Sequence, residues 1–130
     1  ICRIVRKIKP EAFQALFYLF SKSIPSEKNF HGYQLVACDG TRLNLPYNPA
    51  DSDTFVDNIE GRKGFNQVHM NALYDILNDL FLDVEMQGMH EMNERGAFCK
   101  FLDKHSEDMQ KTIFIADRGY HILIEHSLIK

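Results

Sequence analysis

The chain has 130 residues, of which 45% are apolar and 25% are charged. These proportions are typical of a globular domain, so they exclude disordered and fibrous classes, and the length suits one domain with a core but not two. The net charge of −3 and the pI near 6.1 speak mildly against a small DNA-binding module, because such modules are usually basic.

The N-terminal part predicts a helix followed by extended chain. Residues 10–22 (PEAFQALFYLFSK) begin with a first-turn proline and carry apolar residues with the spacing of an amphipathic helix. This Phe/Leu stripe is more typical of core material than of a partner groove, although truncation of the chain would leave it exposed. A polar connector follows over 23–32, and the stretch 33–46 contains two short extended runs that meet at Asp39-Gly40. The first run can be buried on both faces, as in a central strand.

The middle of the chain predicts a loop and a hairpin. The segment 47–65 is rich in Pro, Asp, Asn and Gly and is expected to be a long surface loop. Residues 66–76 and 80–87 read as strands, and the turn residues 77–79 separate them. This pattern predicts a β-hairpin.

The last third predicts a helix, a strand and another helix. The first helix is expected over 93–105, with Asn93 as its N-cap. Residues 112–116 (TIFIA) predict a short strand that ends at Asp117, and a further helix is expected over 121–130. The whole order is an α/β pattern in which the last strand lies parallel to the first.

Three cysteines, Cys2, Cys38 and Cys99, are odd in number and widely spaced, with no CxxC. They argue against a disulfide framework and a zinc site, and they favour a reducing compartment. No apolar run is long enough to cross a bilayer, so we expect a cytoplasmic protein without a membrane partner.

Two aspartates stand out because each follows an apolar strand: Asp39 follows LVAC, and Asp117 follows IFIA. If the strands are neighbours, the carboxylates lie within about 5 Å, the usual interstrand spacing. Like charges at that distance repel unless a cation separates them, and Mg²⁺ prefers such oxygen ligands. The alternative is that each is a turn residue, because Asp39-Gly40 is a common turn dipeptide and Asp117 can begin a loop.

Three blocks around these aspartates resemble a known family. The stretches 32–54 (GYQLVACDGTRLNLPYNPADSDT), 65–79 (FNQVHMNALYDILND) and 113–120 (IFIADRGY) resemble, in this order, the DDE transposases of the IS-four-like insertion sequences. In that resemblance Asp39 matches the first acidic residue of the family and Asp117 the second.

The resemblance implies a ribonuclease H-like fold: a mixed sheet of three antiparallel strands plus a parallel fourth, with flanking helices, here truncated before the fifth strand. Residues 1–32 would be an N-terminal helical segment and connector, and 33–130 the N-terminal part of the catalytic domain. Both ends of the chain are expected to be cuts, since it begins with Ile and stops in a helical pattern.

The resemblance also implies a reaction. Three carboxylates would hold two Mg²⁺ or Mn²⁺ ions, which activate a water or 3′-hydroxyl and steady the leaving oxygen of an in-line displacement. The implied steps are strand cleavage at transposon ends and transfer of the freed 3′-OH into target DNA. The implied partners are DNA and further copies of the protein, with no small-molecule substrate.

The chain departs from the family at the third ligand. The family's glutamate lies in a later Tyr-Arg-Glu-Lys type motif, and no such motif precedes Lys130; Glu125 follows Asp117 too closely. We therefore expect this chain to be catalytically inactive and to bind metal weakly. Mg²⁺-dependent nuclease activity in the 130-residue chain would contradict this.

Two further residues are candidates for DNA contact. Arg118 either binds a DNA phosphate or pairs with a nearby carboxylate. Thr41 either orients the loop or contacts the DNA backbone, or it is an ordinary polar turn residue exposed to solvent. The six histidines show no ligand spacing, so structural or surface roles are favoured for them.

Two other functions remain open. A ribonuclease H-like nuclease or resolvase would need a further acid, such as Asp83 or Glu85, to point at the site. A catalytically inactive remnant used for assembly needs no such acid. Truncation before the fifth strand would leave the fourth strand as an unprotected edge and would expose apolar surface, so we expect self-association.

Overall fold

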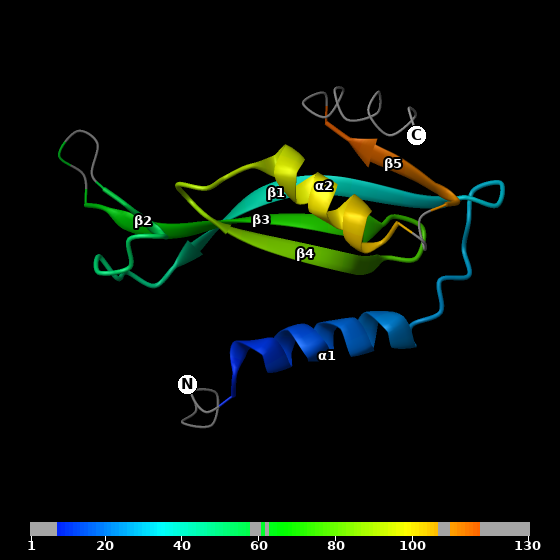
Figure 1. The fold of residues 1–130 in the computed structure, drawn as a ribbon, viewed down its shortest axis with the longest axis horizontal. Helices are drawn as coiled ribbons and strands as arrows, with labels where there is room; N and C mark the ends of the chain where they lie inside the picture. Colours follow the sequence, from blue (N-terminus) through cyan, green and yellow to red (C-terminus); the bar gives the residue numbers. More distant parts are fainter. Residues whose placement is uncertain (1–7, 58–60, 62, 107–109, 118–130) are drawn as a thin grey trace.

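The computed structural model describes residues 8–57, 61, 63–106 and 110–117, and Figure 1 shows a twisted sheet with two helices. The helices and strands are α1 (Pro10–Ser23), β1 (Gln34–Leu45), β2 (Phe55–Val56), β3 (Phe65–Asp75), β4 (Leu80–Gly88), α2 (Glu94–Lys104) and β5 (Thr112–Ala116). The predicted α/β class is confirmed. The helix expected over 121–130 lies outside the described residues. None of the described helices has the length and apolar character needed to span a membrane.

The sheet has the order β4-β3-β1-β5, and β2 extends it beside the start of β3. Strands β1, β3 and β4 pair antiparallel, whereas β5 pairs with β1 in parallel, from Gln34↔Thr112 to Cys38↔Ala116. The predicted hairpin and the predicted parallel alignment of the last strand with the first are therefore confirmed. A parallel pair requires a long connection, and the connection from β1 to β5 runs through β2, β3 and β4 and then through helix α2.

Strand β1 corrects the expectation of two short runs that meet at a turn. It continues without a break through Asp39 and Gly40, and β3 pairs with it from Val36↔Asp75 to Leu45↔Asn66. A neighbouring strand that offers hydrogen bonds along the whole segment outweighs the local turn preference of Asp-Gly. The turn interpretation of Asp39 is thus wrong.

The core lies between the sheet and α2. Its buried side chains include Val36 and Cys38 of β1, Leu73 of β3, and Phe98 and Phe101 of α2. Phe114 of β5 packs edge-to-face on Phe98, with 5.2 Å between ring centroids. The predicted cap of α2 is confirmed, because the Asn93 side chain accepts a hydrogen bond from the Gly96 amide at 2.9 Å.

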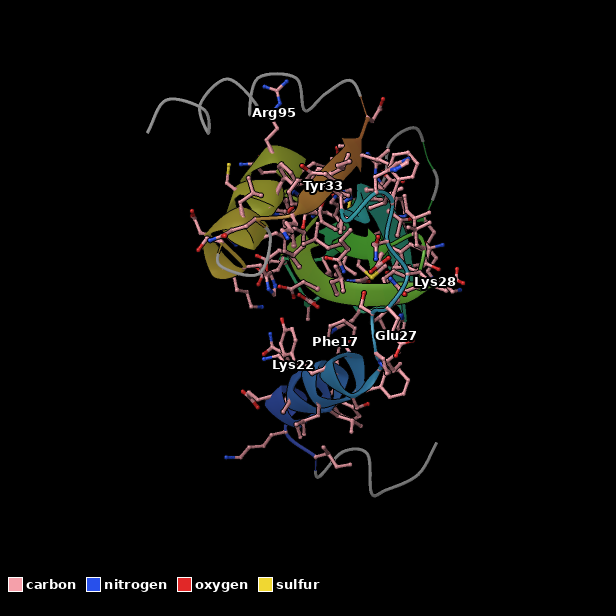
Figure 2. The ribbon with its side chains drawn as sticks, turned by 90° about the vertical axis from the view of Figure 1, so that its right-hand side faces the viewer. Phe17, Lys22, Glu27, Lys28, Tyr33 and Arg95 are labelled. Atoms are coloured by element: carbon pink, nitrogen blue, oxygen red, sulfur yellow. The ribbon has the colours of Figure 1, made fainter. Side chains whose placement is uncertain are left out.

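Helix α1 lies along β4, at the edge of the sheet opposite β5 (Figure 1). Ser21 Oγ donates to the Phe81 carbonyl at 2.9 Å, so the helix covers part of the outer edge of β4. Phe17 lies on the side of α1 that faces the sheet (Figure 2).

The interpretation of the Phe/Leu stripe of α1 as core material is wrong for most of its residues. The side chains that remain largely exposed are Phe13, Leu16, Leu19 and Phe20. The reason is positional: α1 contacts the edge strand β4 rather than lying across a sheet face, so only a narrow strip of the helix meets the sheet.

The segment 47–65 is ordered where it is described and includes the unpredicted strand β2. Phe55 and Val56 pair with the start of β3. The buried Asn66 side chain holds the segment that precedes β2 in place. Asn66 accepts from the Asn48 amide at 2.6 Å and donates to the Thr54 hydroxyl at 2.9 Å. A two-residue strand of this kind depends on tertiary pairing, which local sequence does not encode.

Candidate metal centre

Asp39 and Asp117 lie at equivalent points of two neighbouring strands. The parallel pairing of β1 with β5 ends at Cys38↔Ala116, and each aspartate is the next residue of its chain. Neighbouring strands are about 5 Å apart, so the two backbones are adjacent where the carboxylates begin. The predicted adjacency of the two strands is confirmed. Both aspartates are exposed.

Strand alternation places Asp39 on the face of the sheet away from α2, and Asp117 directly follows the strand beside it. Cys38 and Phe114 point into the core under α2. Because side chains alternate along a strand, Ala116 shares that face and Asp39 belongs to the opposite one. Asp117 directly follows β5, and continued alternation would direct it to the side of Asp39. Two carboxylates on one face of adjacent strands are a suitable pair of oxygen ligands for a divalent cation.

Asp39 lines a shallow depression of about 210 Å³ on the face of the sheet away from α2. Its lining is largely apolar and comes from β1, β3 and β4: Ala37, Asp39, Gly40, Thr41, Met70, Ala72, Tyr74 and Phe81. Asp39 therefore places a carboxylate at the margin of an apolar surface. The Asp39 carboxylate also accepts a hydrogen bond from the Gly40 amide at 2.8 Å.

Asp83 and Glu85 do not join this site, which corrects the nuclease alternative that needed one of them. Asp83 pairs across the sheet with Leu73 on the α2 side, and Glu85 forms an ion pair with Lys100 of α2. Both side chains thus point to the face opposite Asp39. Strand parity removes them as third ligands.

Asp83 has a structural role. It is 1% exposed and accepts hydrogen bonds from Tyr18 Oη at 2.5 Å, Lys104 Nζ at 2.9 Å and His105 Nε2 at 2.7 Å. Tyr18 belongs to α1, and Lys104 and His105 lie at the end of α2. The carboxylate therefore ties both helices to β4.

Within the described ranges, no three His, Cys, Asp or Glu side chains gather closely enough to hold a metal ion. Thr41 lies in β1 and lines the depression beside Asp39, as its proposed role requires. Arg118 lies outside the described residues. The arrangement offers two carboxylates, and a complete two-metal centre needs more ligands than these.

A polar network behind Asp39 was not expected from the sequence. The side chains of His69 and Asn71 are buried in β3 on the α2 side, and Gln87 and Asn93 link them to the start of α2. The available signal was the placement of polar residues at alternate positions of β3. That signal is ambiguous, because alternate polar residues ordinarily face solvent.

Comparison of the chain with protein-family models, with curated proteins and with solved structures finds no match.

Proposed function

We propose that this chain is part of the catalytic domain of a DDE-type DNA transposase with a ribonuclease H-like fold. The observation that supports the proposal is the register of β1 and β5, in which Asp39 and Asp117 are the residues that follow the last pair, Cys38↔Ala116. The sheet order β4-β3-β1-β5, antiparallel through its first three strands and parallel at its fourth, agrees with the fold that the sequence resemblance implies.

In this proposal Asp39 and Asp117 are two ligands of a Mg²⁺ or Mn²⁺ centre. Their chemistry fits, because hard divalent cations prefer carboxylate oxygens. Such ions, when bound, supply Lewis acidity to the attacking and leaving oxygens of a phosphoryl transfer. The proposal requires a third carboxylate, and the family's Tyr-Arg-Glu-Lys type motif does not occur within these 130 residues, so we expect this chain alone to bind metal weakly and to lack activity.

The proposed substrates are transposon ends and target DNA, and the proposed assembly is a homo-oligomer. Thr41 and Arg118 are candidate contacts to the DNA backbone. The polar Thr41 side chain is exposed beside Asp39, where a phosphate approaching the carboxylates would meet it. The cytoplasm is the proposed location.

A second candidate function is a catalytically inactive subunit that serves assembly. The exposed apolar residues of α1 and β5 favour it, since large exposed apolar surfaces mark interaction sites. This candidate needs neither aspartate for its function, which separates it from the first.

An excision assay tests the transposase proposal. The full-length coding sequence that contains these 130 residues is placed with its flanking DNA in a reporter cell, and loss of the flanked segment is counted. Asp39→Asn and Asp117→Asn should each reduce excision to background, a loss on the order of a thousandfold or more when an essential catalytic group is removed.

The matched control is Asp103→Asn, because Asp103 is an exposed aspartate of α2, on the other side of the sheet. It should excise at the wild-type rate. Excision close to wild type in either Asp39→Asn or Asp117→Asn contradicts the proposal and leaves assembly as the function.

A further inference from the structure

The backbone at Gly40 is packed directly against a buried histidine. A Cβ atom on Gly40 would lie 2.6 Å from His69 Nε2 and 2.9 Å from Glu94 Oε1, distances at which real Cβ atoms are not found. His69 is 3% exposed. Only glycine at position 40 lets the imidazole approach β1 this closely, one residue from the Asp39 carboxylate.

The imidazole of His69, in β3, contacts a second residue of its own strand and the first residue of α2. Its Nε2 lies 3.2 Å from Asn71 Oδ1 and 3.3 Å from Glu94 Oε1. Both partners are acceptors, so Nε2 carries the hydrogen and donates. Glu94 is the first residue of α2, and the imidazole thus links the start of this helix to the strand behind Asp39.

The network continues through Asn71 and Gln87. Asn71 Nδ2 donates to Gln87 Oε1 at 3.2 Å. Gln87 Oε1 also accepts from the Asn93 amide at 2.9 Å, and Gln87 Nε2 donates to the Asn93 carbonyl at 3.2 Å. Side chains of β3 and β4 therefore hold the residues that open α2, and His69 transmits this constraint to Gly40.

Folding alone gives a poor reason for a histidine at this place. The Nδ1 atom of His69 is buried and finds no hydrogen-bond partner among the described residues, and such an atom costs free energy that an apolar side chain would not. This destabilising group lies against Gly40, just after the parallel pairing of β1 with β5 ends and next to the candidate metal ligand Asp39.

We propose that His69 is a positioning residue for the candidate metal centre. It fixes the backbone of Gly40 against β3 and the start of α2, and through that backbone it fixes the direction of the Asp39 carboxylate. The proposal rests on the proposed function in one respect only, namely that Asp39 binds a divalent cation.

Mn²⁺ titration of the ¹⁵N-labelled 130-residue chain tests this role, because paramagnetic broadening of amide signals detects weak sites. In the wild type, broadening should centre on Asp39 and Asp117. His69→Leu fills the space without a donor and should weaken Mn²⁺ binding about fivefold or more, as expected when ligand preorganisation is lost. His69→Gln restores an N–H donor and should bind within about twofold of wild type.

Amide hydrogen exchange distinguishes the positioning role of His69 from metal binding by Asp39. His69→Leu should accelerate exchange at residues 39–41 while leaving Leu73 and Phe101 of the core protected. Wild-type Mn²⁺ affinity and wild-type exchange in His69→Leu overturn the positioning role. Absence of broadening at both aspartates in the wild type overturns metal binding, and exchange at 39–41 then decides the positioning role alone.

A double-mutant cycle covers the case in which His69→Leu does not fold. Gly40→Ala should accelerate exchange at residue 39, because its Cβ meets the imidazole. His69→Ala alone should also accelerate exchange, but it vacates the space that the alanine Cβ needs, so the double variant should show clearly less acceleration than the sum of the two single substitutions. Additive effects of the two substitutions overturn the proposed contact.

Discussion

At the residue scale, Asp83 is a carboxylate whose burial and hydrogen bonds act on its pKa in opposite directions. Burial raises the pKa of Asp83, because the charged form loses hydration. Hydrogen bonds from Tyr18, Lys104 and His105 stabilise the charged form and outweigh burial, so the pKa is held below its ordinary value. A group with a lowered pKa in the folded state stabilises the fold above its unfolded pKa.

Asp83→Asn should lower the free energy of unfolding at pH 7 by about 2 kcal/mol, the cost of a broken buried network that is partly open to solvent at Lys104. The stabilisation by Asp83 is present above the unfolded pKa of about 4 and is lost as pH falls through the lower folded pKa. The difference between wild type and variant should therefore shrink below about pH 4.

Urea denaturation at several pH values measures this difference. Asp103→Asn is the matched control, since it removes an exposed carboxylate from the same helix that carries Lys104. It should change stability by less than about 0.5 kcal/mol. An Asp83→Asn penalty that stays constant down to pH 2 would contradict the assigned charge state.

At the element scale, α2 depends on its N-cap. Asn93 has a non-helical backbone with φ −149° and ψ 88°, and its side chain accepts a hydrogen bond from the Gly96 amide, one of the donors that a helix start leaves unpaired. Its backbone is held separately by Gln87. The side chain therefore contributes to helix stability independently of the network behind Asp39.

Asn93→Ala should lower the free energy of unfolding by about 1 kcal/mol, because the capping bond is lost while the backbone contacts to Gln87 remain. Asn93→Ser keeps a capping oxygen and should lose only a few tenths of a kcal/mol. Thermal and urea unfolding compare the variants. Equal losses in both would show that the cap is not the cause.

Element prediction succeeded where the signal was local. The helices α1 and α2, the hairpin of β3 and β4, and strand β5 all follow from periodicity, turn residues or caps within the element itself. Strand β2 and the continuity of β1 through Asp39-Gly40 depend on pairing with β3, a partner distant in sequence.

At the scale of the whole molecule, the described residues leave one sheet face and one sheet edge uncovered. Helix α2 covers one face only, and β5 pairs with β1 alone among the described strands. Ile113 and Ile115 of β5 are 39% and 48% exposed, and Leu19 of α1 is 70% exposed. An apolar edge strand of this kind pairs readily with another chain.

The 130-residue chain should therefore self-associate, with a weight-average mass in sedimentation equilibrium that rises with concentration. Ile115→Lys places a charge on the edge strand and should shift the chain toward monomer. Leu19→Lys tests whether α1 forms the contact instead. A wild-type chain that stays monomeric at all concentrations would contradict the prediction.

The sequence by itself determined helices α1 and α2, the β3–β4 hairpin, strand β5, the α/β class and the two aspartates after apolar runs. Each of these follows from residues near one another in the chain: apolar spacing, caps, turn residues and a charge after a hydrophobic run. The parallel alignment of the last strand with the first also followed, since a crossover helix leaves few other topologies.

Only the tertiary structure decided which face each strand buries. In β3 the polar His69, Asn71 and Asp75 are buried on the same face as Leu73, whereas Met70, Ala72 and Tyr74 lie on the half-open face. A period of two identifies two faces but does not say which one a helix will cover. Polar side chains are buried where other elements satisfy them, as Gln34, Ser26 and Asn78 do for Asp75.

The same choice of face separated Asp39 and Asp117 from Asp83 and Glu85. All four are carboxylates on or beside strands of one sheet, and the sequence offered no means to sort them. Sheet register and the side on which α2 packs sorted them, because a shift of one position along a strand moves a side chain to the other face.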